Sequence, residues 1–323
     1  MPSEVLKKLP TALAVVGMTC VSFNGAATAA STQESNVQRP APDAAHVKEI
    51  EEYRKRRVES LTKPDGWTAI IGMHWLEPGR YTVGNAEGND IRLVIGPARI
   101  GVIEEKDGRA VFIPEPGVPL LSGGAAVTGP VELKRYSQGT PATTVGYDGG
   151  KGSVELILSG KRRALRVRHA DAPTRVNFAG LDYWPIDPSW RIKGKFVPHK
   201  EARVVPVLDV LGGLNDQVNP GVVTFERDGK TFTLEVIGDA SRGLSLMFAD
   251  RTNGKGGSYP AGRFLFTGLP DANGDVIIDF NRTYTPPCAF TEFGTCLLPP
   301  PENRLNLAIT AGEKTYSKAK SYL

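Results

Sequence analysis

The chain has 323 residues, of which 40% are hydrophobic and 23% are charged, and this is the composition of a globular rather than a disordered protein. Its 39 Lys and Arg against 35 Asp and Glu leave a formal net charge of +4, so composition gives no reason to expect a nucleic-acid partner. The 36 glycines and 25 prolines predict short elements with many turns and exclude a protein of long helices.

Residues 1–29 have the three parts of a secretory signal peptide. Lys7 and Lys8 form the basic start, an apolar stretch extends to Phe23, and Ala27-Thr28-Ala29 is a small-x-small cleavage site. We therefore expect an exported protein, periplasmic or extracellular. No later segment approaches roughly 18 apolar residues, so we expect no transmembrane segment in the mature chain. Cys20 leaves lipid attachment open.

Residues 30–62 are expected to hold a flexible leader and then one helix. Pro42-Asp43 opens a stretch in which apolar residues recur at a spacing of three and four, and Lys63-Pro64-Asp65-Gly66 ends it. The recurring positions include Val47, Ile50, Val58 and Leu61.

From Trp67 onward the hydrophobic period changes to two. Many short strands separated by turns such as Asp107-Gly108 predict a β-sandwich over residues 63–170. Residues 171–200 carry prolines and tryptophans that break this rhythm, and we expect a packed connector there. Residues 201–323 predict a second β domain with a tail rich in proline and cysteine. The predicted fold class is thus mainly β, with two antiparallel sandwich-like or barrel-like domains and one N-terminal helix.

Two cysteines, Cys288 and Cys296, remain after removal of the signal peptide. In an oxidising compartment they can close a ring of about nine residues. Two reduced, buried thiols or a metal or redox site are the alternatives. A metal needs more ligands, and no histidine follows His199, so we expect a structural disulfide and no metal. The nearby Leu298-Pro299-Pro300-Pro301-Glu302 either stiffens a loop or offers a polyproline helix to a partner.

Motifs of common enzyme classes are absent from the sequence. There is no Gly-x-Ser-x-Gly elbow, no His-Glu-x-x-His zinc motif, and no glycine-rich loop for a nucleotide, so we expect no cofactor. The four histidines, His46, His74, His169 and His199, are each expected to be structural.

The best candidate for a ligand site is a polar group in the second β domain. Arginine offers a planar fork of donors, and asparagine and tyrosine offer directional hydrogen bonds, so such a group can hold an anionic or sugar-like ligand. On a strand Asp279 and Asn281 would share one face. The alternative is a buried Asp–Arg pair, with capping bonds that hold the tail against the sheet. The candidate residues are Asp250, Tyr259, Arg263, Asp279, Asn281, Arg282 and Tyr284.

Three hypotheses about function follow. The leading one is a binding protein for a small molecule or an envelope protein, with its cleft near these residues. The second is a metal-independent extracellular hydrolase, with His199 or His74 as the base and Asp279 as the carboxylate. The third is a purely structural protein. A histidine close to a carboxylate and a hydroxyl in one cleft would favour the enzyme, whereas a cleft of Arg, Asn and Tyr would favour binding.

Two strings near the C-terminus carry a family resemblance. They are Asp279-Phe280-Asn281-Arg282-Thr283-Tyr284-Thr285-Pro286-Pro287-Cys288-Ala289-Phe290-Thr291 and Thr295-Cys296-Leu297-Leu298-Pro299-Pro300-Pro301-Glu302-Asn303. With Gly72-Met73-His74-Trp75-Leu76, these strings resemble a bacterial family known only as a domain of unknown function. The resemblance covers roughly residues 45 to 318 and implies one fold family, without an activity.

The first β domain also resembles a forkhead-associated sandwich. The resemblance rests on Gly79-Arg80-Tyr81-Thr82-Val83-Gly84 and on Ala98-Arg99-Ile100-Gly101-Val102-Ile103. Members that bind phosphothreonine have a Ser-Arg-x-x-His loop, whereas this chain has no histidine there. The resemblance therefore implies architecture only.

Overall fold

The structure is a computed structural model that describes residues 43–316, except residues 138 and 255. The predicted signal peptide, Cys20 and the predicted flexible leader up to residue 42 lie outside the described residues.

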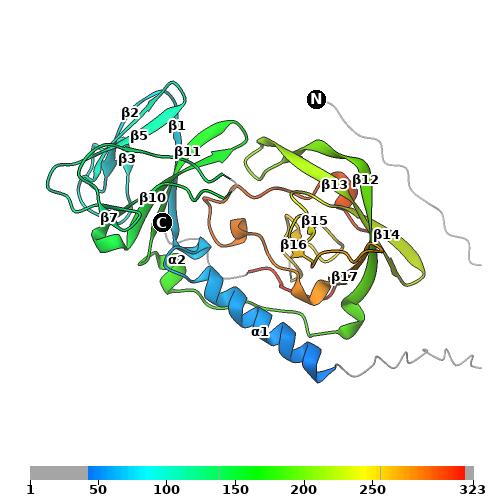
Figure 1. Cartoon of the computed structure of the whole chain (residues 1–323). Coiled ribbons are helices and arrows are strands. Elements are labelled where there is room, and N and C mark those ends of the chain that lie inside the picture. Colours follow the sequence, from blue (N-terminus) through cyan, green and yellow to red (C-terminus); the bar gives the residue numbers. More distant parts are fainter. Residues whose placement is uncertain (1–42, 138, 255, 317–323) are drawn as a thin grey trace, which may run out of the picture. The chain divides into compact units, whose positions relative to one another are not determined.

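Helix α1, Ala44–Leu61, is the predicted N-terminal helix (Figure 1). Asp43 caps it, since its Oδ1 accepts a hydrogen bond from the Ala45 amide at 3.0 Å. The helix ends at Leu61, directly before the predicted stop signal, and buries Ile50 and Leu61. In the described part of the chain, no helix combines the length and the apolar character that a membrane crossing needs.

The first β region is the predicted sandwich, built from two facing sheets. One sheet has the order β3-β2-β4-β5-β8, and the other has the order β1-β11-β10-β9-β6-β7. Side chains such as Phe112 from the first sheet and Leu165 from the second share one core. The strands are β1 (Ile70–Leu76), β2 (Gly79–Gly84), β3 (Ile91–Arg92), β4 (Gly101–Lys106), β5 (Arg109–Pro114), β6 (Leu121–Ser122), β7 (Ala125–Ala126), β8 (Val131–Glu132), β9 (Thr144–Tyr147), β10 (Gly152–Ser159) and β11 (Arg162–His169).

The short segment between the β regions contains helix α2, Pro173–Val176, and a 3-10 turn, Pro188–Trp190. Strand β12 then begins at Arg191, inside the stretch expected to be a connector. The prolines keep residues 185–188 out of the sheet, and the extended pairing starts as soon as the chain has passed Trp190.

The second β region has a four-stranded sheet in the order β14-β13-β12-β17 and a two-stranded sheet of β15 and β16. Its core packs around Phe280, whose ring centroid lies 5.4 to 5.8 Å from those of Trp190, Phe225 and Phe248. A two-residue turn at Asp228-Gly229 joins β13 to β14, and both residues have the positive φ that a hairpin turn of this kind requires. The strands are β12 (Arg191–Leu208), β13 (Leu214–Arg227), β14 (Lys230–Glu235), β15 (Ser245–Phe248), β16 (Arg263–Phe266) and β17 (Asp275–Asp279).

Strand β12 carries a wide bulge. Its pairing with β13 stops at Pro198 opposite Gly221 and resumes at Arg203 opposite Asn219. Several residues of β12, His199 among them, thus lie opposite a single residue of β13. Such a bulge bends the strand and changes the direction of its side chains.

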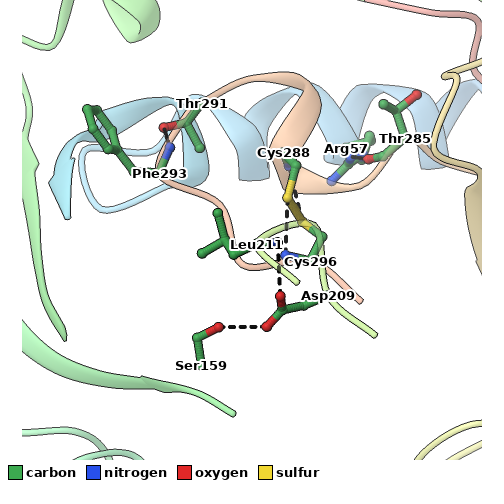
Figure 2. Close-up of a disulfide and its surroundings, with 9 residues drawn as sticks. All are labelled: Arg57, Ser159, Asp209, Leu211, Thr285, Cys288, Thr291, Phe293 and Cys296. Carbon is green, nitrogen blue, oxygen red and sulfur yellow. Dashed lines mark hydrogen bonds between the residues drawn. A yellow bond between two sulfur atoms is a disulfide. The ribbon is translucent and has the colours of Figure 1, made fainter. Parts of the chain in front are cut away.

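The predicted disulfide between Cys288 and Cys296 is confirmed, with Cα atoms 6.1 Å apart (Figure 2). It lies beside the end of β12, where the Val210 amide donates to the Cys296 carbonyl and the Leu298 amide donates to the Leu208 carbonyl. The tail that contains the proline run is therefore attached to the second β region.

Asp209, at the end of β12, joins the two β regions. Its carboxylate accepts hydrogen bonds from the hydroxyl of Ser159 at 2.6 Å and from the amide of Leu211 (Figure 2). The amide of Gly213 donates a third bond. The Asn215 side chain donates a further bond. Burial disfavours the ionised form, but these hydrogen bonds outweigh it and lower the pKa of Asp209. The described residues belong to one compact unit.

Candidate functional site

Asp250 and Arg263, two of the predicted site residues, form a buried ion pair. Arg263 Nη2 lies 2.5 Å from Asp250 Oδ2, and neither side chain is exposed to solvent. Arg263 also donates to the carbonyls of Ile309 and Ala311, in the last described segment of the chain. Burial lowers the pKa of the Arg263 guanidinium, and the Asp250 carboxylate opposes that shift. These are the contacts expected of a pair that holds the tail against the sheet.

Asp279 and Asn281 are also buried and also join distant segments. Asp279 ends β17, and Asn281 lies in the 3-10 turn that follows, so the two do not share a strand face as the spacing suggested. Asp279 Oδ2 lies 2.7 Å from His46 Nε2 of helix α1. The Asn281 side chain exchanges two hydrogen bonds with the backbone of Asp187, as a neighbouring strand would.

The other three predicted residues are partly buried. Arg282 lies over the ring of Tyr53 and reaches Glu49 at 3.4 Å, both on helix α1. Tyr284 packs against Phe264, and burial raises the pKa of its hydroxyl. Burial also raises the pKa of Tyr259.

The predicted residues therefore lie in a network that holds helix α1, the connector and the tail on the second β region. Their contacts are those of the structural alternative, and none of them lines the pocket considered next. Their role in binding a ligand stays a prediction.

The residues of the hydrolase hypothesis lie apart. Asp279 contacts His46 rather than His199 or His74. His74 is partly buried in β1, and burial lowers the pKa of its imidazole. His199 lies instead beside Glu235, with 3.8 Å between His199 Nε2 and Glu235 Oε2. A distance of 3.8 Å is too long for a hydrogen bond.

The side of the second β region next to His199 contains a pocket of about 360 Å³. Strand β12 contributes Arg203, Val205 and Val207, which share a face because side chains alternate along a strand. Asn219 lies opposite Arg203 on β13, and Glu235 ends β14. The proline run forms the remaining wall. In the described part of the chain, the lining residues are Arg203, Val205, Pro206, Val207, Asn219, Glu235, Ile237, Pro300, Pro301 and Glu302.

Asn303 fixes the proline wall of this pocket to β14. Its side-chain oxygen accepts from the Glu235 amide at 2.7 Å, and its Nδ2 donates to the carbonyls of Glu235 and Met247. This fully buried amide takes the place of a neighbouring strand. The Pro-Pro-Pro-Glu-Asn string thus has a structural explanation: the asparagine anchors the segment, and Pro300, Pro301 and Glu302 then face the pocket.

Glu235 and Asn219 are the polar centre of the pocket. Asn219 Nδ2 donates to Glu235 Oε2 at 2.6 Å, which fixes the orientation of the amide. Asn219 is 3% exposed, and its Oδ1 has no hydrogen-bond partner in the structure. His199 Nε2 is likewise buried without a partner. A buried acceptor without a partner costs about 1–3 kcal/mol, which a ligand with a donor group would recover.

The lining determines what this pocket can do chemically. Valine and isoleucine side chains form an apolar floor beside the proline wall, and the described polar lining includes two carboxylates and a single guanidinium. None of the described lining residues carries a hydroxyl, so the pocket itself offers no side-chain nucleophile of that kind. In the described part of the chain, no group of three His, Cys, Asp or Glu side chains is placed to hold a metal ion.

Sequence reasoning identified His199 and the proline run but not their shared location. Asn219 and Glu235 carry no signal in the sequence, because each is a single polar residue in an ordinary strand pattern. The β12 bulge, which brings His199 beside Glu235, likewise depends on the pairing of strands and cannot be inferred from spacing.

Comparison with known proteins agrees with the expected resemblance to an uncharacterised family. Residues 176–314 match the family described as "Protein of unknown function (DUF1684)", so the match begins well after residue 45. An uncharacterized protein of Haloarcula marismortui, solved by NMR, is 32% identical, and the alignment covers 44% of this chain and 79% of that chain with a TM-score of 0.37. No curated protein was found to match the chain. The matched segment, residues 176–314, includes every residue named in the lining of the pocket.

Proposed function

We propose that the protein is an exported binding protein that holds a small molecule in the pocket of Arg203, Asn219 and Glu235. The observation that carries this proposal is the buried Asn219 Oδ1, which has no partner although it belongs to a pocket wall. Protein interiors satisfy nearly all buried polar atoms, so an exception in a pocket points to a ligand. The basic start, apolar run and cleavage site of residues 1–29 support export, as does the disulfide.

The lining also indicates the class of ligand. Asn219 Oδ1, Glu235 and Glu302 are acceptors, and the two carboxylates outnumber Arg203. The apolar floor of Val205, Val207 and Ile237 favours a hydrocarbon body. The ligand that fits is therefore an amphipathic amine, with an ammonium group on Glu235 and Asn219.

A melting-temperature screen tests this proposal. The library contains primary amines with apolar bodies and, for each amine, the alcohol and the carboxylic acid of the same skeleton. At a ligand concentration 100 times the dissociation constant, binding stabilises the native state by about 2.7 kcal/mol, which gives a measurable shift. We expect amines to raise the melting temperature and the matched acids to leave it unchanged.

A matched pair of variants locates the site. Glu235→Gln removes the carboxylate charge in the pocket and keeps the shape, whereas Glu226→Gln makes the same change at an exposed position of β13. We expect Glu235→Gln to abolish the shift and Glu226→Gln to preserve it. Equal shifts in both variants, or no shift with any amine, would sink the proposal.

The resemblance of residues 63–170 to a forkhead-associated sandwich remains our proposal about architecture. The two facing sheets with a shared core support it. It adds no binding activity.

A hydrolase remains the second candidate because His199 lies beside a carboxylate at the pocket. In this alternative Glu235 replaces Asp279 as the partner of the histidine, and His199 accepts a proton from an attacking water. The test is to incubate any compound that binds and to look for its products. Products that disappear with His199→Gln would favour the enzyme, while recovery of the intact compound favours binding alone.

A further inference from the structure

A second pocket, of about 260 Å³, lies in the first β region, outside the segment matched by the family. It lies where β5, β8 and the residues that follow β8 meet β10 and β11. The described residues that line it are Gly108, Arg109, Ala110, Glu132, Leu133, Lys134, Arg135, Ser137, Leu156, Leu158 and Arg163. The proposed function makes no use of this pocket.

The charge of this second pocket is opposite to that of the first. Among the described lining residues, Arg109, Lys134, Arg135 and Arg163 stand beside a single carboxylate, Glu132. Arg109 Nε donates to Glu132 at 3.1 Å. Arg163 Nη1 donates at 2.8 Å to Glu105, a carboxylate just behind the pocket that is only 5% exposed.

These two pairs leave Lys134 and Arg135 as a surplus of positive charge. Both are exposed, and the Arg135 guanidinium donates to a neutral group, the Tyr136 carbonyl, at 3.4 Å. Arg109 and Arg163 are each held in position by a carboxylate, so their remaining donors are pre-oriented. A concave surface with this surplus attracts anions, because a cleft concentrates the field of the charges along its walls.

The size of the pocket restricts the anion. A volume of 260 Å³ lies just below the range of about 300–1,000 Å³ that is usual for drug-sized ligands. Guanidinium groups match the geometry of phosphate oxygens with two parallel hydrogen bonds, and lysine adds a point charge. We propose that this pocket is a binding site for a small phosphorylated molecule, with Lys134 and Arg135 as the residues that contact the phosphate.

Titration calorimetry on the purified full chain tests this proposal, with inorganic phosphate, a hexose phosphate and the unphosphorylated hexose as probes. We expect both phosphate-bearing probes to bind at low salt and the hexose to give no signal. Raising the salt concentration should weaken binding, since exposed charges are screened within about 8 Å at physiological ionic strength. Absence of heat with both phosphate probes, or equal binding of the plain hexose, overturns the proposal.

Three variants separate the pocket from the general charge of the protein. We expect Lys134→Ala and Arg135→Ala each to weaken phosphate binding about ten-fold, as the loss of one charge-assisted contact does. Lys161→Ala removes the same charge from an exposed turn between β10 and β11 and is expected to have no effect. An equal loss in all three variants would mean diffuse attraction and would refute the site.

Glu235→Gln keeps the two proposals distinguishable. This substitution alters the acidic pocket of the second β region and should leave phosphate binding unchanged. Failure of the amine screen therefore leaves the phosphate-site proposal intact. Failure of the phosphate titrations likewise leaves the amine proposal intact.

Discussion

Replacement of Arg263 by methionine tests whether the buried network is structural. Methionine keeps a flexible, unbranched apolar stem but removes the charge and every donor. The side chain of Asp250 is fully buried, so the variant leaves an unpaired carboxylate away from water. The carbonyls of Ile309 and Ala311 also lose their hydrogen bonds from Arg263.

The magnitude follows from this burial. Breaking a buried ion pair by removing one partner costs about 3–5 kcal/mol, so we expect Arg263→Met to lower the free energy of unfolding by about 4 kcal/mol. That is a large part of the roughly 5–15 kcal/mol that stabilises an ordinary domain. Adding Asp250→Asn removes the unpaired carboxylate charge, so the double variant should be more stable than Arg263→Met alone.

Urea unfolding followed by tryptophan fluorescence measures these differences. Trp190 is a suitable probe because it is 4% exposed and packs in the core of the second β region. Arg242→Met is the matched control, since Arg242 is exposed and its loss should change stability by no more than about 0.5 kcal/mol.

The reasoning is refuted if Arg263→Met costs less than about 1 kcal/mol, well below the range for a broken buried pair. It is also refuted if the costs of Arg263→Met and Asp250→Asn simply add in the double variant, because residues in contact must couple. Either result would mean that the pair does not hold the tail on the sheet.

Three further predictions concern stability. Replacing both cysteines of the disulfide with alanine should lower the free energy of unfolding by about 2.5 kcal/mol, which is the loop-closure entropy for a sequence separation of 8. Urea unfolding with and without reductant measures this difference. Asp209→Asn should destabilise the chain at pH 7. Because the pKa of Asp209 is lowered from 3.8, its charged form stabilises the fold above that value, and this contribution is lost as the pH falls further. The urea midpoints of variant and parent should therefore converge below pH 4. A difference that stays constant with pH would contradict this prediction. Asn303→Ala should lower the free energy of unfolding by about 2–4 kcal/mol, since three hydrogen bonds are lost. A melting temperature within 1 °C of the parent would contradict the role of Asn303 as the anchor of the proline wall.

The parts of the fold that local chemistry determines could be predicted from the sequence. The helix was predicted because Asp43 caps it and Lys63-Pro64 follows its end, and both signals lie within a few residues of the element. The sandwich was predicted because alternation and Asp-Gly turns are local, as Asp107 and Asp228 with positive φ illustrate. The disulfide followed from two cysteines close in sequence.

The site depends on contacts between distant residues, and these have no local signal. The spacing of Asp279 and Asn281 suggested a shared strand face, but the strand ends at Asp279 and the chain turns. The partner of Asp279 is His46, 233 residues earlier in the chain. Glu235 and His199 meet only because of the bulge in β12. Polarity alone could not distinguish a buried anchor such as Arg263 from a pocket residue such as Arg203.

The contacts between helix α1 and the last described segment have a consequence for the timing of folding. Arg57 Nε donates to Glu313 Oε1 at 2.9 Å, although 256 positions separate the two residues. At a synthesis rate of about 5–20 residues per second, Glu313 is synthesised roughly 13–50 s after Arg57. Because the sheet core is nearly complete by then, closure of the helix onto the tail is expected to be the last step of maturation. A chain shortened before Glu313 would lose this contact and leave helix α1 held only by its earlier partners, such as Asp279 and Arg282.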